Sequence, residues 1–128
     1  MAIRIVRLGS ERSKNEGVRI GTVRRPPRGV AKGDIAKRDF YDTWLPELAP
    51  SEALVKQALG ATDERAWKAF VRRYRAEMKR PEAQHLLALF ATLSRTTNLA
   101  MGCYCEDESH CHRSILRQLL AEHDAVLA

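Results

Sequence analysis

The order of the apolar segments constrains the fold of this chain more than any other feature of its sequence. Two short segments near the start, residues 3–8 and 18–23, carry apolar side chains in the pattern of strands. Helical segments follow, then an apolar stretch at residues 96–104 with the composition of a buried strand, then a closing amphipathic helix. A strand that follows earlier strands after intervening helices indicates at least one parallel crossover. The sequence therefore predicts an α/β protein, a small three-layer-like domain with a short, mostly parallel sheet flanked by helices.

The helical segments in the middle of the chain have recognisable ends. Ser51 is the expected N-cap of a first helix that ends at Gly60, and Thr62 is the expected N-cap of a second. Pro81 separates the second helix from a third. The second helix carries a stripe at helical spacing that we expect to face the core: Trp67, Phe70, Val71, Tyr74 and Met78. The closing helix is expected to carry Ile115, Leu116, Leu119, Leu120, Val126 and Leu127.

The length of 128 residues fits a single domain with one core, spanning residues 1–128. Arginines interrupt the apolar N-terminus, and no apolar run is long enough to span a bilayer, so neither a signal peptide nor a membrane helix is expected. Three cysteines within nine residues make a poor disulfide framework. We therefore expect a cytoplasmic protein with no membrane partner; the sequence indicates no oligomeric state.

The net charge of +6 is concentrated in the N-terminal third of the chain. Residues 1–38 contain eleven lysines and arginines against three acidic residues, whereas the remainder contains eleven against thirteen. Four of these cations lie on a loop that two prolines and two glycines keep out of regular structure: Arg24, Arg25, Arg28 and Lys32. Such a loop suits a phosphate-bearing or other anionic small ligand, and a solvated basic surface is the alternative interpretation.

The segment 103–113, Cys-Tyr-Cys-Glu-Asp-Glu-Ser-His-Cys-His-Arg, follows the predicted third strand. Ligands of parallel sheets bind beyond the carboxyl ends of the strands, near helix N-termini. If the strand continues through Cys105, the side chains of Cys103 and Cys105 share one face. On the closing helix, His112 falls on the apolar stripe and points toward the core or the strand end. Arg113 can reach round the helix N-terminus, where unpaired N–H groups favour an anion.

Three interpretations of this segment are open. The first is an active site in which Arg113 binds an anion and the candidate nucleophilic or acid–base groups are Cys111, His112 and Glu106. The helix N-terminus would lower the pKa of Cys111 if its thiol were exposed. The second is a zinc site with ligands from Cys103, Cys105, Cys111 and one of His110 and His112, although the spacing lacks paired Cys-x2-Cys units. The third is burial of structural cysteines beside a hydrogen-bonded core histidine.

Three blocks of this sequence resemble the family catalogued as Domain of Unknown Function 488 (DUF488). The blocks are RIGTVRRPPRGVAK at 19–32, YDTWLPELAPS at 41–51 with WKAFVRRYRAEM at 67–78, and CYCEDESHCHRSIL at 103–116. The resemblance implies a compact α/β fold with the basic loop and the Cys-His-Arg segment as candidate site elements, and it implies no reaction. The chain departs from the commoner pattern at residues 24–27, where many relatives have an aspartate and a tryptophan. Some shorter relatives lack the cysteines, which argues against a thiol as the chemistry of the whole family.

Two further function classes stand beside the small-ligand site, and the sequence does not decide whether the protein is an enzyme. A nucleic-acid-binding module is indicated by the basic first third and by predicted exposed cations: Arg72, Arg73, Arg75, Lys79 and Arg80. The small number of aromatic residues weakens that interpretation, since base stacking needs them. A non-catalytic interaction protein with structural cysteines is the third class, and Asp42, Trp44 and Glu47 would mark its contact surface.

Overall fold

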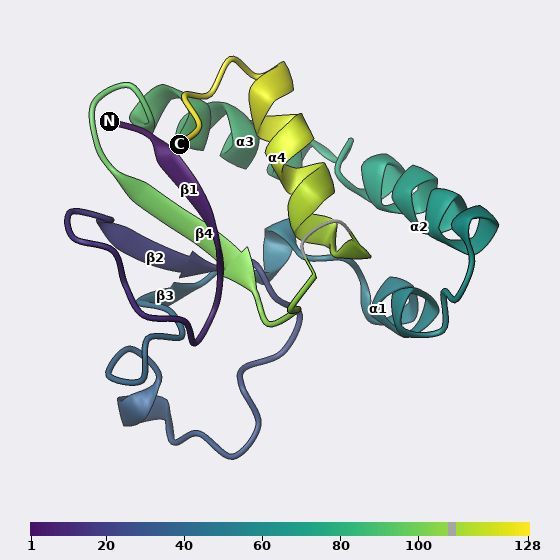
Figure 1. Ribbon diagram of the computed structural model, residues 1–128. Helices are drawn as coiled ribbons and strands as arrows, with labels where there is room; N and C mark the ends of the chain where they lie inside the picture. Colours follow the sequence, from purple (N-terminus) through teal and green to yellow (C-terminus); the bar gives the residue numbers. More distant parts are fainter. Residues whose placement is uncertain (108–109) are drawn as a thin grey trace.

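Four parallel strands form the sheet in the computed structural model, which describes residues 1–107 and 110–128 (Figure 1). The strands are β1 (Ile3–Arg7), β2 (Val18–Gly21), β3 (Thr43–Trp44) and β4 (Leu99–Cys103), and their order across the sheet is β1-β4-β2-β3. β4, the last strand in the sequence, pairs in parallel with both β1 and β2, and all of its residues are buried. The predicted α/β fold with a parallel sheet is confirmed.

Three helices fill the crossover from β3 to β4, and a fourth follows β4. They are α1 (Glu52–Leu59), α2 (Glu64–Glu77), α3 (Pro81–Leu93) and α4 (His112–Glu122), with short 3-10 turns η1 (Lys32–Asp34) and η2 (Pro46–Leu48) before them. In Figure 1 the helices gather on one side of the strands, and the long segment between β2 and β3 extends away from them below the sheet. Over the described residues, no helix is long and apolar enough to cross a membrane.

The core lies between the sheet and the helices. The predicted stripe of α2 faces it, with Phe70, Tyr74 and Met78 buried and Trp67 packed against them. Tyr74 donates a hydrogen bond of 2.7 Å to the carbonyl of Leu48, which satisfies its hydroxyl inside the core. The remaining core side chains come mainly from α3, α4 and the inner strands: Ala83, Leu87, Leu99, Met101, Ile115, Leu116, Leu119 and Leu120.

Several element ends differ from the sequence prediction. Asp63, and not Thr62, caps α2, because its carboxylate accepts a hydrogen bond of 2.8 Å from the N–H of Ala66. The final helix ends at Glu122, and Asp124 takes a left-handed backbone conformation with φ of 63°. Val126 and Leu127 therefore lie beyond the helix, where Leu127 forms a parallel bridge with Ile3. Ser51 caps α1 and Pro81 begins α3, as predicted.

β4 ends at Cys103, so Cys105 does not continue the strand as the shared-face argument supposed. The strand is held tightly against its neighbour: a Cβ added at Gly102 would lie 2.0 Å from the carbonyl oxygen of Val6. Only glycine fits this close approach between β1 and β4. The close packing of β4 at Gly102 therefore also fixes the position of Cys103, the next residue.

A buried ion pair fixes the segment between β1 and β2. The guanidinium of Arg19 donates two hydrogen bonds of 2.9 Å to the carboxylate of Glu16. It also donates to the carbonyls of Ser10 and Asp39, at 2.8 and 2.6 Å. Burial by itself would raise the pKa of Glu16, but the hydrogen bonds from Arg19 and Ser13 and the charge of Arg19 outweigh it, so the pKa is lowered. Arg19 is therefore a satisfied structural cation.

Candidate functional site

The Cys-His segment joins the carboxyl end of β4 to the start of α4. Cys103 is the last residue of β4, Cys111 is the N-cap of α4, and His112 is its first residue. Cys103 and Cys111 are buried, whereas Cys105 is exposed. The predicted segment includes residues 108–109, which lie outside the described residues. The site occupies the place where parallel sheets bind ligands, beyond a central strand and at a helix N-terminus.

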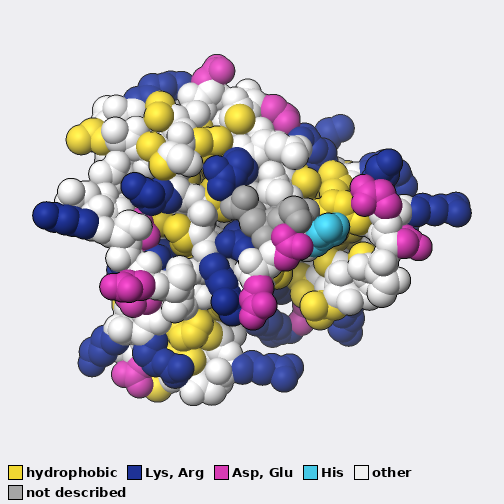
Figure 2. Space-filling view, in the orientation of Figure 1, with side chains coloured by type: hydrophobic (Ala, Val, Ile, Leu, Met, Phe, Trp, Pro, Cys, Tyr) yellow, Lys and Arg dark blue, Asp and Glu magenta, His cyan; other side chains and the backbone are white. Residues whose placement is uncertain are grey.

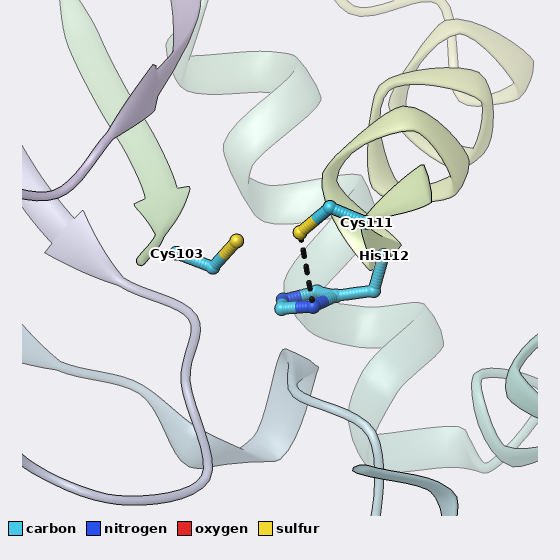
Figure 3. Close-up of side chains that lie close together, drawn as sticks. All are labelled: Cys103, Cys111 and His112. Carbon is cyan, nitrogen blue, oxygen red and sulfur yellow. Dashed lines mark hydrogen bonds between the residues drawn. The ribbon is translucent and has the colours of Figure 1, made fainter. Parts of the chain in front are cut away.

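Three side chains converge at this junction. The sulfurs of Cys103 and Cys111 and a ring nitrogen of His112 all lie within 4.8 Å of one another. Figure 3 shows both sulfurs pointing into the same space beside the imidazole ring. The sulfur of Cys111 is 3.8 Å from Nδ1 of His112. We refer to Cys103, Cys111 and His112 as the Cys-Cys-His cluster.

The protonation state of His112 follows from its backbone partner. Nε2 lies 2.7 Å from the carbonyl oxygen of Thr22, just beyond β2. Because a carbonyl only accepts, Nε2 carries the hydrogen, and Nδ1 of the neutral ring presents its lone pair toward Cys111. Burial lowers the pKa of His112 to about 4, so the neutral form predominates near pH 7. His112 is thus oriented as an electron-pair donor.

The three thiols influence one another. Hydrogen bonds from Cys103 and then Cys111 lower the pKa of Cys105, against the opposing effect of burial, and the positive charge of Arg113 lowers it further. The bond to Cys105 is also the largest cause of the raised pKa of Cys103. For Cys111, the bond from Cys103 lowers the pKa, but the bond to Cys105 and burial outweigh it and raise the pKa to about 11. A negative charge on these sulfurs is therefore favoured at Cys105, the exposed one.

Arg113 is buried directly behind the cluster. Its Nη2 donates a hydrogen bond of 2.5 Å to the carbonyl of Cys105, so it holds the chain that leaves β4. Its Nε has no hydrogen-bond partner, and no carboxylate forms a salt bridge with it among the residues that the structure describes. A buried guanidinium is costly without a compensating negative charge. Its positive charge acts instead on the thiol of Cys105.

A pocket of about 370 Å³ opens over the cluster. Its floor consists of the Cys-Cys-His cluster, and Cys105 and His110 also line it. An apolar wall comes from α1 and α2: Val55, Ala58, Leu59 and Phe70. Arg24 and Arg25 of the basic loop form part of its border. Concave, mostly apolar pockets with a few converging polar groups are typical of small-molecule sites.

The four cations of the basic loop do not lie together in the structure. Arg24 is fully engaged by the carbonyls of Pro46, Ala49 and Pro50, at 2.9 to 3.1 Å, so it anchors the chain before α1. Arg25 is exposed and forms an ion pair with Glu52. Arg28 and Lys32 line two other depressions on the surface and not the pocket over the cluster. The loop therefore brings two of its four predicted ligand-binding residues, Arg24 and Arg25, to the cysteines.

The remaining candidate site residues also differ in whether they line the pocket. Glu106 is exposed and pairs with Arg7 at 3.5 Å, outside the pocket, so Cys111 and His112 come together without it. His110 lines the pocket, but its ring packs on Trp67 with centroids 5.3 Å apart. Of the two histidines that the sequence left open, His112 is the one that faces the cysteines.

Some residues of the site carried no sequence signal. Thr22 orients His112 through its backbone carbonyl, and any residue type has such a carbonyl. The wall from α1 and α2 has the apolar composition of an ordinary core face. Only the three-dimensional structure shows that these residues lie at the same site as the cysteines.

Residues 3–124 match a family model described as the active DUF488-N3 subclade, DUF488-N3a. The match includes the basic loop, all of β4 and the start of α4. The chain matches no curated protein and no solved structure.

Proposed function

The chain belongs to the DUF488 family, in its active DUF488-N3 subclade, and on this premise we propose that it is an enzyme for a small anionic ligand. The ligand would bind in the pocket over the Cys-Cys-His cluster. One observation carries the proposal: a single pocket joins that cluster, an apolar wall and the exposed cation of Arg25. The description of the subclade as active also supports an enzyme.

Arg25 is the cation of the pocket that is best placed to meet an anion. Its partner Glu52 is also exposed, and ion pairs of this kind contribute little, so an anionic ligand can take the place of Glu52. Arg24 supports the loop, since its Nε and Nη2 donate to three carbonyls. The N-terminus of α4 adds the positive end of the helix dipole on the side of the cluster.

The reacting part of the ligand would lie on the floor of the pocket. There Cys111 and His112 offer a sulfur and a neutral nitrogen as electron-pair donors. The apolar side chains of α1 and α2 would exclude water and strengthen electrostatic interactions with the anion. The expected ligand therefore has an anionic group that lies at the border of the pocket and a less polar part that lies inside the pocket.

Binding of inorganic phosphate and of a nucleoside monophosphate tests this proposal. We expect Arg25→Gln to weaken binding of at least one probe about tenfold, the loss of one charged hydrogen bond. The matched control is Arg28→Gln, which removes a cation from the same loop outside the pocket. Equal losses in both variants, or no loss in Arg25→Gln, would contradict the proposal.

A nucleic-acid-binding module is the second candidate, favoured by one surface. Arg65, Lys68 and Arg72 line a shallow depression on α2. By contrast, Arg73, Arg75 and Arg80 make hydrogen bonds to neighbouring groups. Figure 2 shows basic side chains spread over one face of the molecule with acidic ones between them, rather than one continuous basic stripe.

Salt dependence distinguishes this second candidate. An oligonucleotide that follows phosphates along α2 should bind much more weakly as the salt concentration rises toward the physiological level. Replacement of Arg65, Lys68 and Arg72 by glutamine should abolish that binding and leave phosphate binding in the pocket intact. Binding that is insensitive to salt would exclude the nucleic-acid function.

A further inference from the structure

We infer that Cys103, Cys111 and His112 bind one zinc ion, with the fourth coordination position of the metal facing the pocket. The zinc site itself rests on the geometry of the three side chains. The role of its fourth position rests on the proposed function, because that is where a ligand in the pocket would meet the metal.

The separation of the donor atoms fits a tetrahedral ion. With zinc–sulfur bonds of about 2.3 Å and zinc–nitrogen bonds of about 2.0 Å, tetrahedral geometry separates sulfur from nitrogen by about 3.5 Å and two sulfurs by about 3.8 Å. The observed distance from Cys111 Sγ to His112 Nδ1 is 3.8 Å, and all three donor atoms lie within 4.8 Å of one another. Small side-chain movements therefore suffice to bring the donors to bonding distance.

The second hydrogen bond of His112 is the one that a zinc-binding histidine needs. Zinc-bound histidines almost always donate their other ring N–H to a carboxylate, a carbonyl or water, which fixes the tautomer. Nε2 donates to the carbonyl of Thr22 at 2.7 Å and leaves Nδ1 for the metal. Thr22 is itself held by two hydrogen bonds to the carbonyl of Gly102, from its N–H at 3.1 Å and its hydroxyl at 3.0 Å. The histidine is thus oriented by the sheet.

The two cysteines come from rigid elements. Cys103 lies at the end of the central strand, and Cys111 caps α4, so neither depends on a long loop for its position. Zinc binds both as thiolates, so binding of the ion releases their protons. The cluster therefore has suitable ligand types and spacing.

The fourth position distinguishes this site from a structural zinc site. Structural sites have four protein ligands, whereas catalytic sites have three and keep one position for water or substrate. Cys105 is exposed, and although its thiol interacts with those of Cys103 and Cys111, its sulfur is not among the three donor atoms that lie within 4.8 Å of one another. The three cluster residues line the pocket, so a fourth position on the metal can face it. A zinc ion here would supply Lewis-acid activation of a bound oxygen.

The metal content of the purified chain tests the site. We expect one zinc per chain by elemental analysis after extensive dialysis, and visible absorption bands of a tetrahedral thiolate site when cobalt replaces zinc. Cys111→Ser and Cys103→Ser should lose this metal, and His112→Ala should weaken its binding at least about tenfold. The matched controls Cys105→Ser and His110→Ala should retain it. Circular dichroism establishes that each variant is folded.

Each outcome separates the inference from the proposed function. A wild-type chain that binds no zinc, yet still binds phosphate through Arg25, overturns the zinc site and leaves the proposed function standing. A zinc-loaded chain whose phosphate binding does not depend on Arg25 overturns the proposed function and leaves the zinc site standing. Loss of the metal in Cys105→Ser would show four protein ligands and would overturn the open position. Retention of the metal in folded Cys111→Ser and His112→Ala would overturn the assigned ligands.

Discussion

The two buried arginines of this domain differ in how their charges are compensated. Arg19 has a side chain that is 0% exposed and makes two hydrogen bonds to Glu16 and two to carbonyls. Arg113 is 4% exposed, donates to one carbonyl, and has an Nε without a hydrogen-bond partner in the part of the chain that the structure describes. Arg19 is a residue of β2, whereas Arg113 is the second residue of α4.

The two arginines differ in the groups that can balance their charge. Around Arg19 every charge is paired, and the result is a fixed connection between β1 and β2. Around Arg113 the groups able to carry the balancing negative charge are thiols at the floor of a pocket. A buried cation beside ionisable sulfur costs stability in the folded state and favours the thiolate of Cys105.

The largest expected effect is at Glu16. Glu16→Gln leaves Arg19 as an uncompensated buried cation and should lower the free energy of unfolding by about 3 kcal/mol. Urea denaturation measures this change. The control Glu106→Gln removes an exposed carboxylate paired with Arg7 and should change stability by less than about 0.5 kcal/mol. Similar losses in the two variants would show that the buried pair of Glu16 and Arg19 contributes no more to stability than the exposed pair of Glu106 and Arg7.

Acid should reproduce part of the Glu16 effect. The pKa of Glu16 in the folded protein lies below its ordinary value of 4.5, so its contribution to stability is present above about pH 4.5. The contribution disappears as the pH falls through the lowered folded-state pKa. The difference in stability between the wild type and Glu16→Gln should therefore shrink in acid. A difference that stays constant from pH 7 to acid would exclude this carboxylate as its source.

The corresponding change at Arg113 should act on the site more than on the fold. Arg113→Met removes the charge and keeps much of the length of the side chain, so the metal-free protein should lose less than about 1 kcal/mol of stability or gain some. Zinc affinity should fall about tenfold, the lower end of the usual effect of a residue next to a metal ligand. Competition with a chelator measures that affinity. A large loss of stability with unchanged zinc affinity would show that Arg113, like Arg19, is a structural residue.

The smallest effect is expected at the exposed arginine of the pocket. Arg25→Gln breaks only the exposed ion pair with Glu52 and should change the free energy of unfolding by less than about 0.5 kcal/mol. Thermal denaturation of this variant beside Arg28→Gln checks the value. A stability loss comparable to that of Glu16→Gln would place Arg25 among the structural residues and weaken its assignment to ligand binding.

The main elements of the fold were predictable from local sequence patterns. Ser51 and Pro81 marked helix starts through capping and fixed φ, and the stripe of α2 gave its core face. The insertion of β4 between β1 and β2 was not predictable, because it depends on pairing between segments far apart in the chain. Thr62 and Asp63 are adjacent capping residues, and their local sequence did not distinguish them.

The site was predictable where its residues are neighbours in the sequence. His112 faces the cluster as its helical position indicated, and Cys103 and Cys111 meet because β4 leads into α4. The burial of Arg113 and the split of the basic loop at Arg28 depend on tertiary packing. Charge patterns show which residues can meet an anion, and only the fold shows which of them share a pocket.

Zinc K-edge X-ray absorption of the metal-loaded chain would identify the atoms that surround the metal. We expect two sulfur neighbours at about 2.3 Å and two nitrogen or oxygen neighbours at about 2.0 to 2.1 Å, from Cys103, Cys111, His112 and one oxygen ligand. A shell of nitrogen and oxygen alone would mean adventitious zinc on the surface and would contradict the site. Three sulfur neighbours would mean that Cys105 closes the fourth position and that the metal does not face the ligand.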